Sequence, residues 1–116
     1  MSFSRPHSVV ERRAFERHLL RTQAILSLPN GKQFQARTLD IGKGGLGVIA
    51  DINAVIGTGF GLEVNLPILP RGSAMLKAQV RVASCVFDGS EGGFRMGLQF
   101  ERLDPVAQSV LAQSLP

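Results

Sequence analysis

The sequence predicts an all-β domain: a small six-stranded antiparallel β-barrel with a basic N-terminal arm and one short C-terminal helix. Three observations predict this fold. Six short segments alternate apolar and polar residues as strands do, glycine- and proline-rich turns separate them, and only residues 104–115 change to a helical pattern. A chain of 116 residues has the length of a single domain, and no internal repeat or low-complexity tract divides it.

The first half of the chain supplies three of the predicted strands. Residues 24–28 and 34–41 flank Asn30-Gly31, a dipeptide suited to the positive φ angles of a type I′ hairpin turn. A glycine-dense stretch over 42–47 follows, and the apolar residues 48–50 then indicate a short buried strand. A hairpin and a third strand are therefore expected before residue 51.

The second half supplies three longer strands. Residues 60–66 alternate apolar and polar side chains, and prolines and a glycine between 67 and 72 indicate a loop after them. The longest strand is predicted over 74–87, and a last strand, 94–101, follows a turn at 88–93. In the longest strand the period of two places four side chains on one face: Val80, Val82, Ser84 and Val86.

The C-terminal segment predicts a short helix over 104–115. Asp104 is a typical N-cap, and Pro105 occupies the first helical position, where its missing N–H costs nothing. Val106, Val110 and Leu111 are expected to form a narrow apolar stripe against the barrel.

Charge is concentrated at the N-terminus. Residues 1–22 contain five arginines and two glutamates, so they carry three of the four net positive charges. A basic arm on a nearly neutral body favours a localised anion site over a surface for long nucleic acid. A solvated tail is the alternative interpretation of the same composition.

Several classes of protein are poorly supported by the composition. The single Cys85 forms no internal disulfide, no histidine or cysteine cluster has metal-ligand spacing, and His7 and His18 lack a nucleophile partner. We therefore expect no catalytic residue, no metal, no cofactor and no enzyme activity. No apolar run reaches the roughly 20 residues of a membrane span, and no signal peptide is recognisable, so a cytoplasmic location without membrane insertion is expected.

Two motifs resemble the bipartite signature of bacterial PilZ domains, which is RxxxR followed by [D/N]xSxxG. Arg13-x-x-x-Arg17 matches the first part, and Asp40-x-Gly42-x-x-Gly45 matches the second except at Gly42. The segments 97–100 (Gly-Leu-Gln-Phe) and 103–105 (Leu-Asp-Pro) also resemble the last strand of such domains and the step into their helix. The resemblance implies a PilZ-like split barrel and a stand-alone, single-domain receptor for the second messenger cyclic di-GMP.

The resemblance also implies a set of ligand-binding residues: Arg12, Arg13, Arg17, Asp40, Gly42 and Gly45. The arginines are expected to bind phosphate oxygens or guanine edges, and Asp40 to accept from guanine N1–H and N2–H₂. Gly45 is expected to let the turn pass close to the ligand or to adopt a positive φ. An arginine at position 12 implies that the ligand binds as an intercalated dimer.

Gly42 stands where the family pattern has serine. A lost neutral hydrogen bond costs about 0.5–1.5 kcal/mol, which weakens binding by at most about tenfold. Weakened rather than abolished binding is therefore expected. The Gly42 N–H, or a water molecule in the free space, is expected to take the place of the hydroxyl.

The expected mechanism is a binding switch in which the arm, residues 11–21, closes over the barrel and changes the surface shown to a protein partner. Residues 1–10 are expected to be a flexible tail, and 11–116 the barrel domain. Two alternatives remain open: a degenerate PilZ-like interaction module that binds no nucleotide, and a small basic barrel for single-stranded nucleic acid. Locally, the arginines of the arm can instead pair with Glu11 and Glu16, and Asp40 can be a turn residue.

Overall fold

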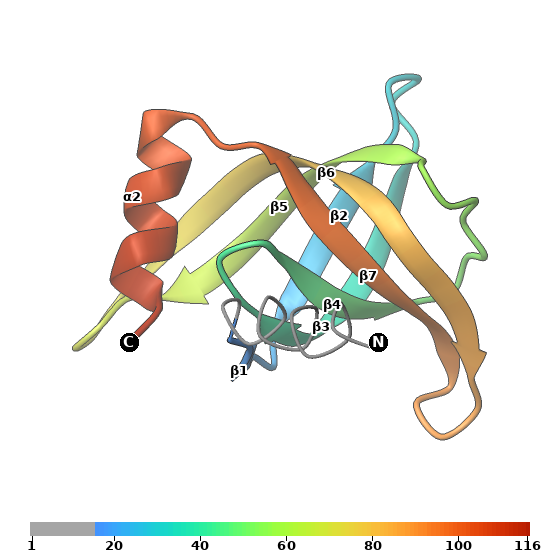
Figure 1. The fold of residues 1–116 in the computed structure, drawn as a ribbon, viewed down its shortest axis with the longest axis horizontal. Helices are drawn as coiled ribbons and strands as arrows, with labels where there is room; N and C mark the ends of the chain where they lie inside the picture. Colours follow the sequence, from blue (N-terminus) through green and yellow to red (C-terminus); the bar gives the residue numbers. More distant parts are fainter. Residues whose placement is uncertain (1–15) are drawn as a thin grey trace, which may run out of the picture.

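The computed structural model describes residues 16–116, and in that range the chain forms a β-barrel with a short helix at one end (Figure 1). All strand pairings in this part of the chain are antiparallel. The elements in chain order are β1 His18–Leu19, β2 Gln23–Ser27, β3 Gln33–Ile41, β4 Gly45–Ala50, β5 Gly59–Pro67, β6 Ser73–Asp88, β7 Gly93–Arg102 and α2 Pro105–Ser114.

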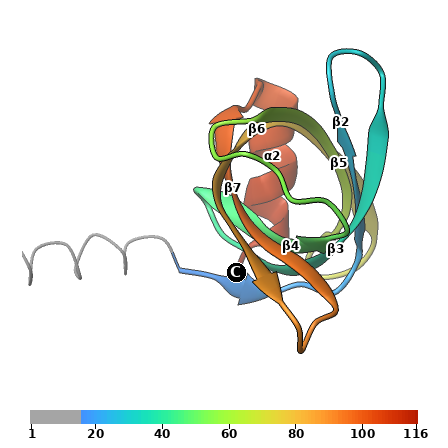
Figure 2. The ribbon, with the colours of Figure 1, turned by 90° about the vertical axis from the view of Figure 1, so that its right-hand side faces the viewer.

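Six of these strands close into a ring, which Figure 2 shows from the end of the barrel. The strand order is β3-β2-β5-β6-β7-β4, and pairing between β3 and β4 closes the ring. The two-residue strand β1 is added outside it, against the end of β3, with Leu19 opposite Asp40. The predicted six-stranded barrel with a C-terminal helix is confirmed, and β1 is an addition that the sequence pattern did not reveal.

The barrel interior is filled by the apolar side chains that the alternation of the strands predicts. In β5 the residues Phe60, Leu62, Val64 and Leu66 are buried, whereas Glu63 between them is exposed. Full burial of one such side chain stabilises the fold by about 1.5–3 kcal/mol. This repeated burial of apolar side chains stabilises the closed barrel.

The prediction for β6 is correct in its first half and wrong in its second. Val80 and Val82 are buried as expected, but the register with β7 shifts between Val82 and Ser84. This irregularity turns the following residues over, so Ser84 and Val86 face solvent and Cys85 packs against the core. A β-bulge adds one residue to a strand and reverses the alternation beyond it.

The turn between β2 and β3 is a hairpin turn, but it is not of type I′. Gly31 has a φ of +93°, and among the described residues no non-glycine has a positive φ. A type I′ turn needs a positive φ at both central residues. Asn30 instead accepts from the Lys32 N–H through its side chain at 2.9 Å, which is typical of an asparagine turn.

Helix α2 begins as predicted, and Val110 and Leu111 of its expected apolar stripe pack against the core. The Asp104 carboxylate accepts from the Ala107 N–H at 2.8 Å, and Pro105 follows it at the start of the helix. Ala107 and Leu111 are the buried residues, while Val106 is 73% exposed, so the expected stripe is wrong at that position. The helix packs across one end of β5 and β6, as Figure 1 shows.

Candidate ligand site

An ion pair joins the segment before β1 to the end of β3. The Arg17 Nη1 donates to Asp40 Oδ1 at 3.0 Å, across 23 positions of sequence. The same carboxylate oxygen accepts from the Gly47 N–H on β4, also at 3.0 Å. The described parts of the two predicted motifs therefore lie in contact.

The base of the arm is held in place by hydrogen bonds around a buried threonine. Thr38 is 1% exposed, and its hydroxyl donates to the Leu20 carbonyl at 2.8 Å and accepts from the Thr22 N–H at 2.9 Å. The Leu20 N–H donates to the Leu39 carbonyl at 3.1 Å, and the Leu20 side chain is buried. These contacts fix the direction in which the chain approaches Asp40.

The turn between β3 and β4 is closed by its own main chain. The Gly42 N–H donates to the Gly45 carbonyl at 2.9 Å, so in this structure it is engaged within the turn. Gly45 does not have a positive φ. A Cβ there would collide with the Leu98 carbonyl of β7, so glycine is required for close approach between strands.

The space that a serine side chain would occupy at position 42 is also filled. A Cβ built on Gly42 would lie 2.5 Å from the Glu16 carbonyl oxygen and 3.4 Å from Arg17 Cδ. A side chain at position 42 is therefore excluded while Glu16 keeps this position. The main chain of the arm occupies the place that the family's serine would take.

A hollow of about 570 Å³ opens beside this turn. Such a volume is within the range of small-molecule sites, which is about 300–1,000 Å³. Four glycines contribute to the lining, so a flat ring can lie directly against main chain. The lining residues are Arg17, Gly42, Gly44, Gly45, Ala83, Ser84, Gly97, Leu98 and Gln99.

Two polar side chains that line this hollow, Ser84 and Gln99, were not among the predicted site residues. Gln99 belongs to the Gly97–Phe100 segment that carried part of the resemblance, and its exposed position could have been read from the alternation of β7. Ser84 faces outward only because of the shift in β6, and its Oγ accepts from the Gly97 N–H at 3.2 Å. No sequence signal marks that shift.

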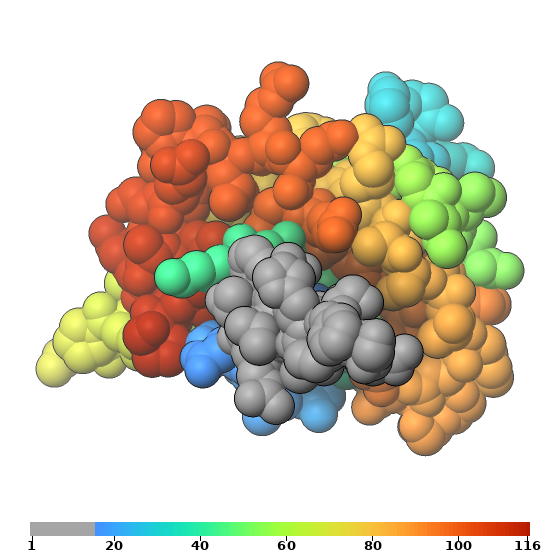
Figure 3. All heavy atoms as spheres, in the orientation of Figure 1, coloured from blue at the N-terminus to red at the C-terminus, as the bar shows by residue number. Residues whose placement is uncertain are grey.

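Figure 3 shows where this region lies on the surface. The green turn between β3 and β4 emerges between the red helix α2 and the blue residues that begin the described chain. Lys43 of that turn and Leu111 of α2 line one further hollow, which confirms that the turn and the helix are neighbours. Arg12 and Arg13, which complete the predicted arginine set, lie outside the described residues.

Other arginines of the barrel are engaged elsewhere. Arg81 donates to Glu101, with 2.8 Å from its Nε, and Arg95 donates to Asp88 at 2.8 Å and 3.0 Å. Hydrogen bonds from Ser90 and Arg95 lower the pKa of Asp88 from 3.8 to about 2. Neither arginine lines the hollow beside Gly42.

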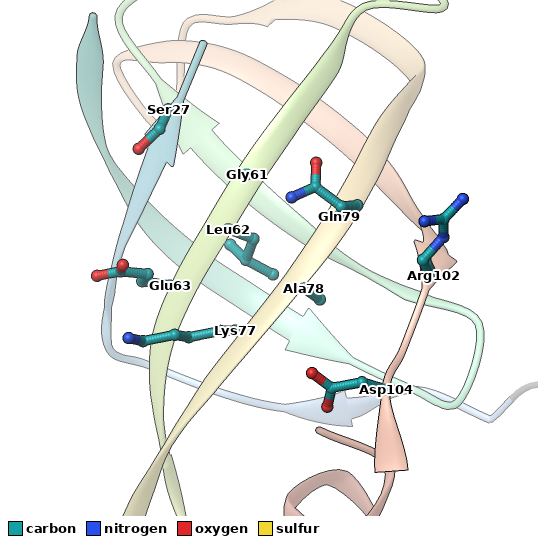
Figure 4. Close-up of a pocket in the computed structure, with 9 residues that line it drawn as sticks. All are labelled: Ser27, Gly61, Leu62, Glu63, Lys77, Ala78, Gln79, Arg102 and Asp104. Carbon is teal, nitrogen blue, oxygen red and sulfur yellow. The ribbon is translucent and has the colours of Figure 1, made fainter. Parts of the chain in front are cut away.

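A second hollow, of about 360 Å³, lies over β5 and β6 (Figure 4). Its charged side chains are of both signs: Glu63 and Lys77 are opposite each other in the strand register, and Arg102 lies above Asp104 in the view. Asp104 is already used as the cap of α2. This mixture shows no preference for an anionic or a cationic ligand.

Residues 16–116 contain neither a metal-binding cluster nor a membrane-spanning helix. No group of three or more histidine, cysteine or acidic side chains in residues 16–116 is arranged to hold a metal ion. In the same range, α2 is too short and too polar to cross a bilayer.

These features define a class: small antiparallel β-barrels whose N-terminal segment meets a glycine-rich turn. The family is shown by sequence, because the model of the PilZ domain matches residues 11–115. The chain therefore belongs to the PilZ domain family. No curated protein matches the sequence significantly.

Solved structures share the fold at low sequence identity. The inhibitor of motility MotI/DgrA of Bacillus subtilis matches with a TM-score of 0.73 and 16% identity, over 87% of this chain and 48% of that chain. The PilZ domain of Escherichia coli YcgR with c-di-GMP matches with a TM-score of 0.67 and 19% identity, over 88% and 87%. A crystal structure of YcgR in complex with c-di-GMP gives 0.67 and 18%, over 87% of this chain and 43% of that chain. The chain thus spans less than half of two of these proteins.

Proposed function

We propose that this protein is a receptor for cyclic di-GMP, which it binds in the hollow beside Gly42 and Gly45. The single observation that carries the proposal is that Arg17, which lines the glycine-rich hollow, contacts Asp40, which does not itself line it. Membership of the PilZ family supports it. Two solved structures of similar fold contain this ligand, and this adds further support.

The chemistry of the hollow suits a guanine nucleotide. Arginine presents a planar fork that binds phosphate oxygens or guanine O6 and N7 with two hydrogen bonds. The carboxylate of Asp40 accepts from guanine N1–H and N2–H₂. The glycines leave main chain on which a purine can lie, and Gln99 and Ser84 add neutral hydrogen-bonding groups at its rim.

Arg12 and Arg13 are proposed to bind the phosphates and guanines from the arm side. Arg17 is the arginine in the described lining of the hollow, and the proximity of Arg12 and Arg13 to it in the sequence supports this proposal. We propose an intercalated dimer of the ligand as the bound form. The position of Arg12 next to the RxxxR motif supports this stoichiometry.

The receptor is proposed to act as an adaptor in the bacterial cytoplasm. Ligand binding draws the arm onto the barrel next to α2 and the β3–β4 turn, and so changes the surface that a protein partner meets. The proximity of Lys43 and Leu111 supports this step, because it places the turn beside the helix.

Calorimetric titration with cyclic di-GMP tests the proposal. Heat of binding with two ligand molecules per protein is expected, and Arg13→Ala and Asp40→Ala should each reduce the affinity. Arg37→Ala is the matched control, since Arg37 pairs with Glu91 on another part of the barrel. Absence of heat in the wild type refutes the proposed function, whereas unchanged heat in both site variants assigns the ligand to another site.

One observation favours the second candidate, an interaction module that binds no nucleotide. The Glu16 carbonyl occupies the place of the family's serine side chain. If the protein is such an interaction module, the wild type should give no heat with cyclic di-GMP but should still bind a protein partner. A steep salt dependence of oligonucleotide binding in a filter assay would instead support the nucleic-acid barrel.

A further inference from the structure

We infer that Gly42 is a positioning residue: it lets Glu16 and Arg17 lie against the β3–β4 turn in a self-paired state, in which Arg17 holds Asp40 and competes with the ligand. This inference rests on the proposed function of the same site and adds its regulation. The absence of a side chain at position 42 then lowers the affinity for the ligand by allowing Arg17 to pair with Asp40. This effect adds to any loss of a hydroxyl.

The main chain at Glu16 lies very close to the main chain at Gly42. The Glu16 carbonyl oxygen lies 2.5 Å from the position that a Cβ of residue 42 would occupy. Atoms that are not bonded to each other do not approach a Cβ so closely, because overlap repulsion rises steeply at this distance. Any residue larger than glycine at position 42 therefore requires the arm to move.

Residues 16–20 have little freedom to move without losing their contacts. Leu19 and His18 pair with the end of β3, and the Leu20 N–H donates to the Leu39 carbonyl at 3.1 Å. The clashing oxygen belongs to Glu16, only two residues before the start of β1. A Cβ at position 42 is therefore expected to displace Glu16 and Arg17 and to loosen the adjoining pairs of β1.

The segment that contacts Gly42 also carries Arg17, a residue of the proposed ligand site. Arg17 Cδ lies 3.4 Å from the same Cβ position, and its guanidinium reaches Asp40 Oδ1 at 3.0 Å. That oxygen already accepts from the Gly47 N–H. A guanine that pairs with both oxygens of Asp40 therefore competes with Arg17 for Oδ1, and a phosphate that binds Nη1 of Arg17 competes with Asp40.

The competition is modest because the ion pair is open to water. The side chains of Arg17 and Asp40 are 46% and 37% exposed. Exposed ion pairs contribute little, so removal of the closed state should change affinity by about two- to fivefold. A ligand with several charged groups can open such a pair, which is the property that a regulated site needs.

Gly42→Ala tests the closed state without any ligand. Alanine adds only a Cβ and no hydroxyl, and Gly59→Ala is the matched control because its nearest contact would be at 3.9 Å. By hydrogen exchange, we expect the Leu20 amide, which donates to the Leu39 carbonyl, to exchange about two- to fivefold faster in Gly42→Ala. The amides of β5 should be unchanged in both variants, which shows that the barrel remains folded. Equal protection of Leu20 in the wild type and in Gly42→Ala overturns the inference.

Titration of the same proteins with cyclic di-GMP tests the competition. Gly42→Ala should bind about two- to fivefold more tightly than the wild type, and Gly42→Ser at least as tightly as Gly42→Ala. Affinity that falls in Gly42→Ala overturns the competition even if the arm is loosened. Absence of binding by every variant refutes the proposed function and the competition, whereas the exchange of Leu20 still decides whether Gly42 seats the arm.

Discussion

Replacement of Arg17 by alanine should separate ligand affinity from stability. In the structure Arg17 forms an ion pair with Asp40 in which the two side chains are 46% and 37% exposed. Exposed pairs of this kind are worth at most about 1 kcal/mol, so the melting temperature should fall by no more than about 4–8 °C. If Arg17 donates a charged hydrogen bond to the ligand, its loss costs about 1.5–3 kcal/mol, which weakens binding roughly 10- to 150-fold.

Calorimetry with cyclic di-GMP and thermal unfolding of the same samples measure the two quantities. Arg17→Lys keeps the charge but loses the fork, and should give an intermediate affinity. Arg37→Ala is the control, because Arg37 forms a comparable pair with Glu91 at 3.4 Å and is 52% exposed, but does not line the hollow. Wild-type affinity in Arg17→Ala would refute the assignment of this arginine to the ligand, whatever happens to its melting temperature.

Three further substitutions should change the stability of the fold. Gly45→Ala should prevent normal folding, as judged by circular dichroism, because its Cβ would collide with the Leu98 carbonyl where β4 pairs with β7; a wild-type melting curve would contradict this. Thr38→Val should lower the free energy of unfolding in urea by about 1–3 kcal/mol, because the buried hydroxyl serves Thr22 and Leu20. A change much below this range would mean that water replaces the hydroxyl. Asp88 has a pKa near 2 in the fold against 3.8 without its partners, so its stabilising effect is present above pH 3.8 and lost as the pH falls toward 2. As the pH falls from 3.8 toward 2, the melting temperature of Asp88→Asn should fall less steeply than that of the wild type. Identical slopes would show that Asp88 does not contribute to the pH dependence.

The sequence predicted the strands well wherever a regular alternation continued over several residues. The period of two in β5 is a local property, and burial of Phe60, Leu62 and Val64 followed from it. The prediction was wrong beyond Val82, because the extra residue in β6 depends on how that strand pairs with β7. Val106 was misplaced for a similar reason, since the end of the barrel decides which face of α2 is buried.

The candidate site was predictable in part. The order and spacing of the two motifs predicted that Arg17 and Asp40 belong together, and the structure has them in contact. Strand β1 was not predictable from its pattern, since two residues carry no periodicity. The bond of the Gly42 N–H within its turn and the contact of Glu16 with Gly42 were not predictable, because both depend on main-chain atoms that the one-dimensional sequence does not bring together.

By itself, the sequence determined the kind of fold and the chemical groups available for a ligand, because alternation, capping and charge are properties of neighbouring residues. Only the tertiary structure decided that the Glu16 carbonyl rests on Gly42 and that Arg17 is already paired with Asp40. The physical reason is that such contacts depend on the register between β1 and β3, which the burial of Leu20 and the hydrogen bonds of Thr38 stabilise.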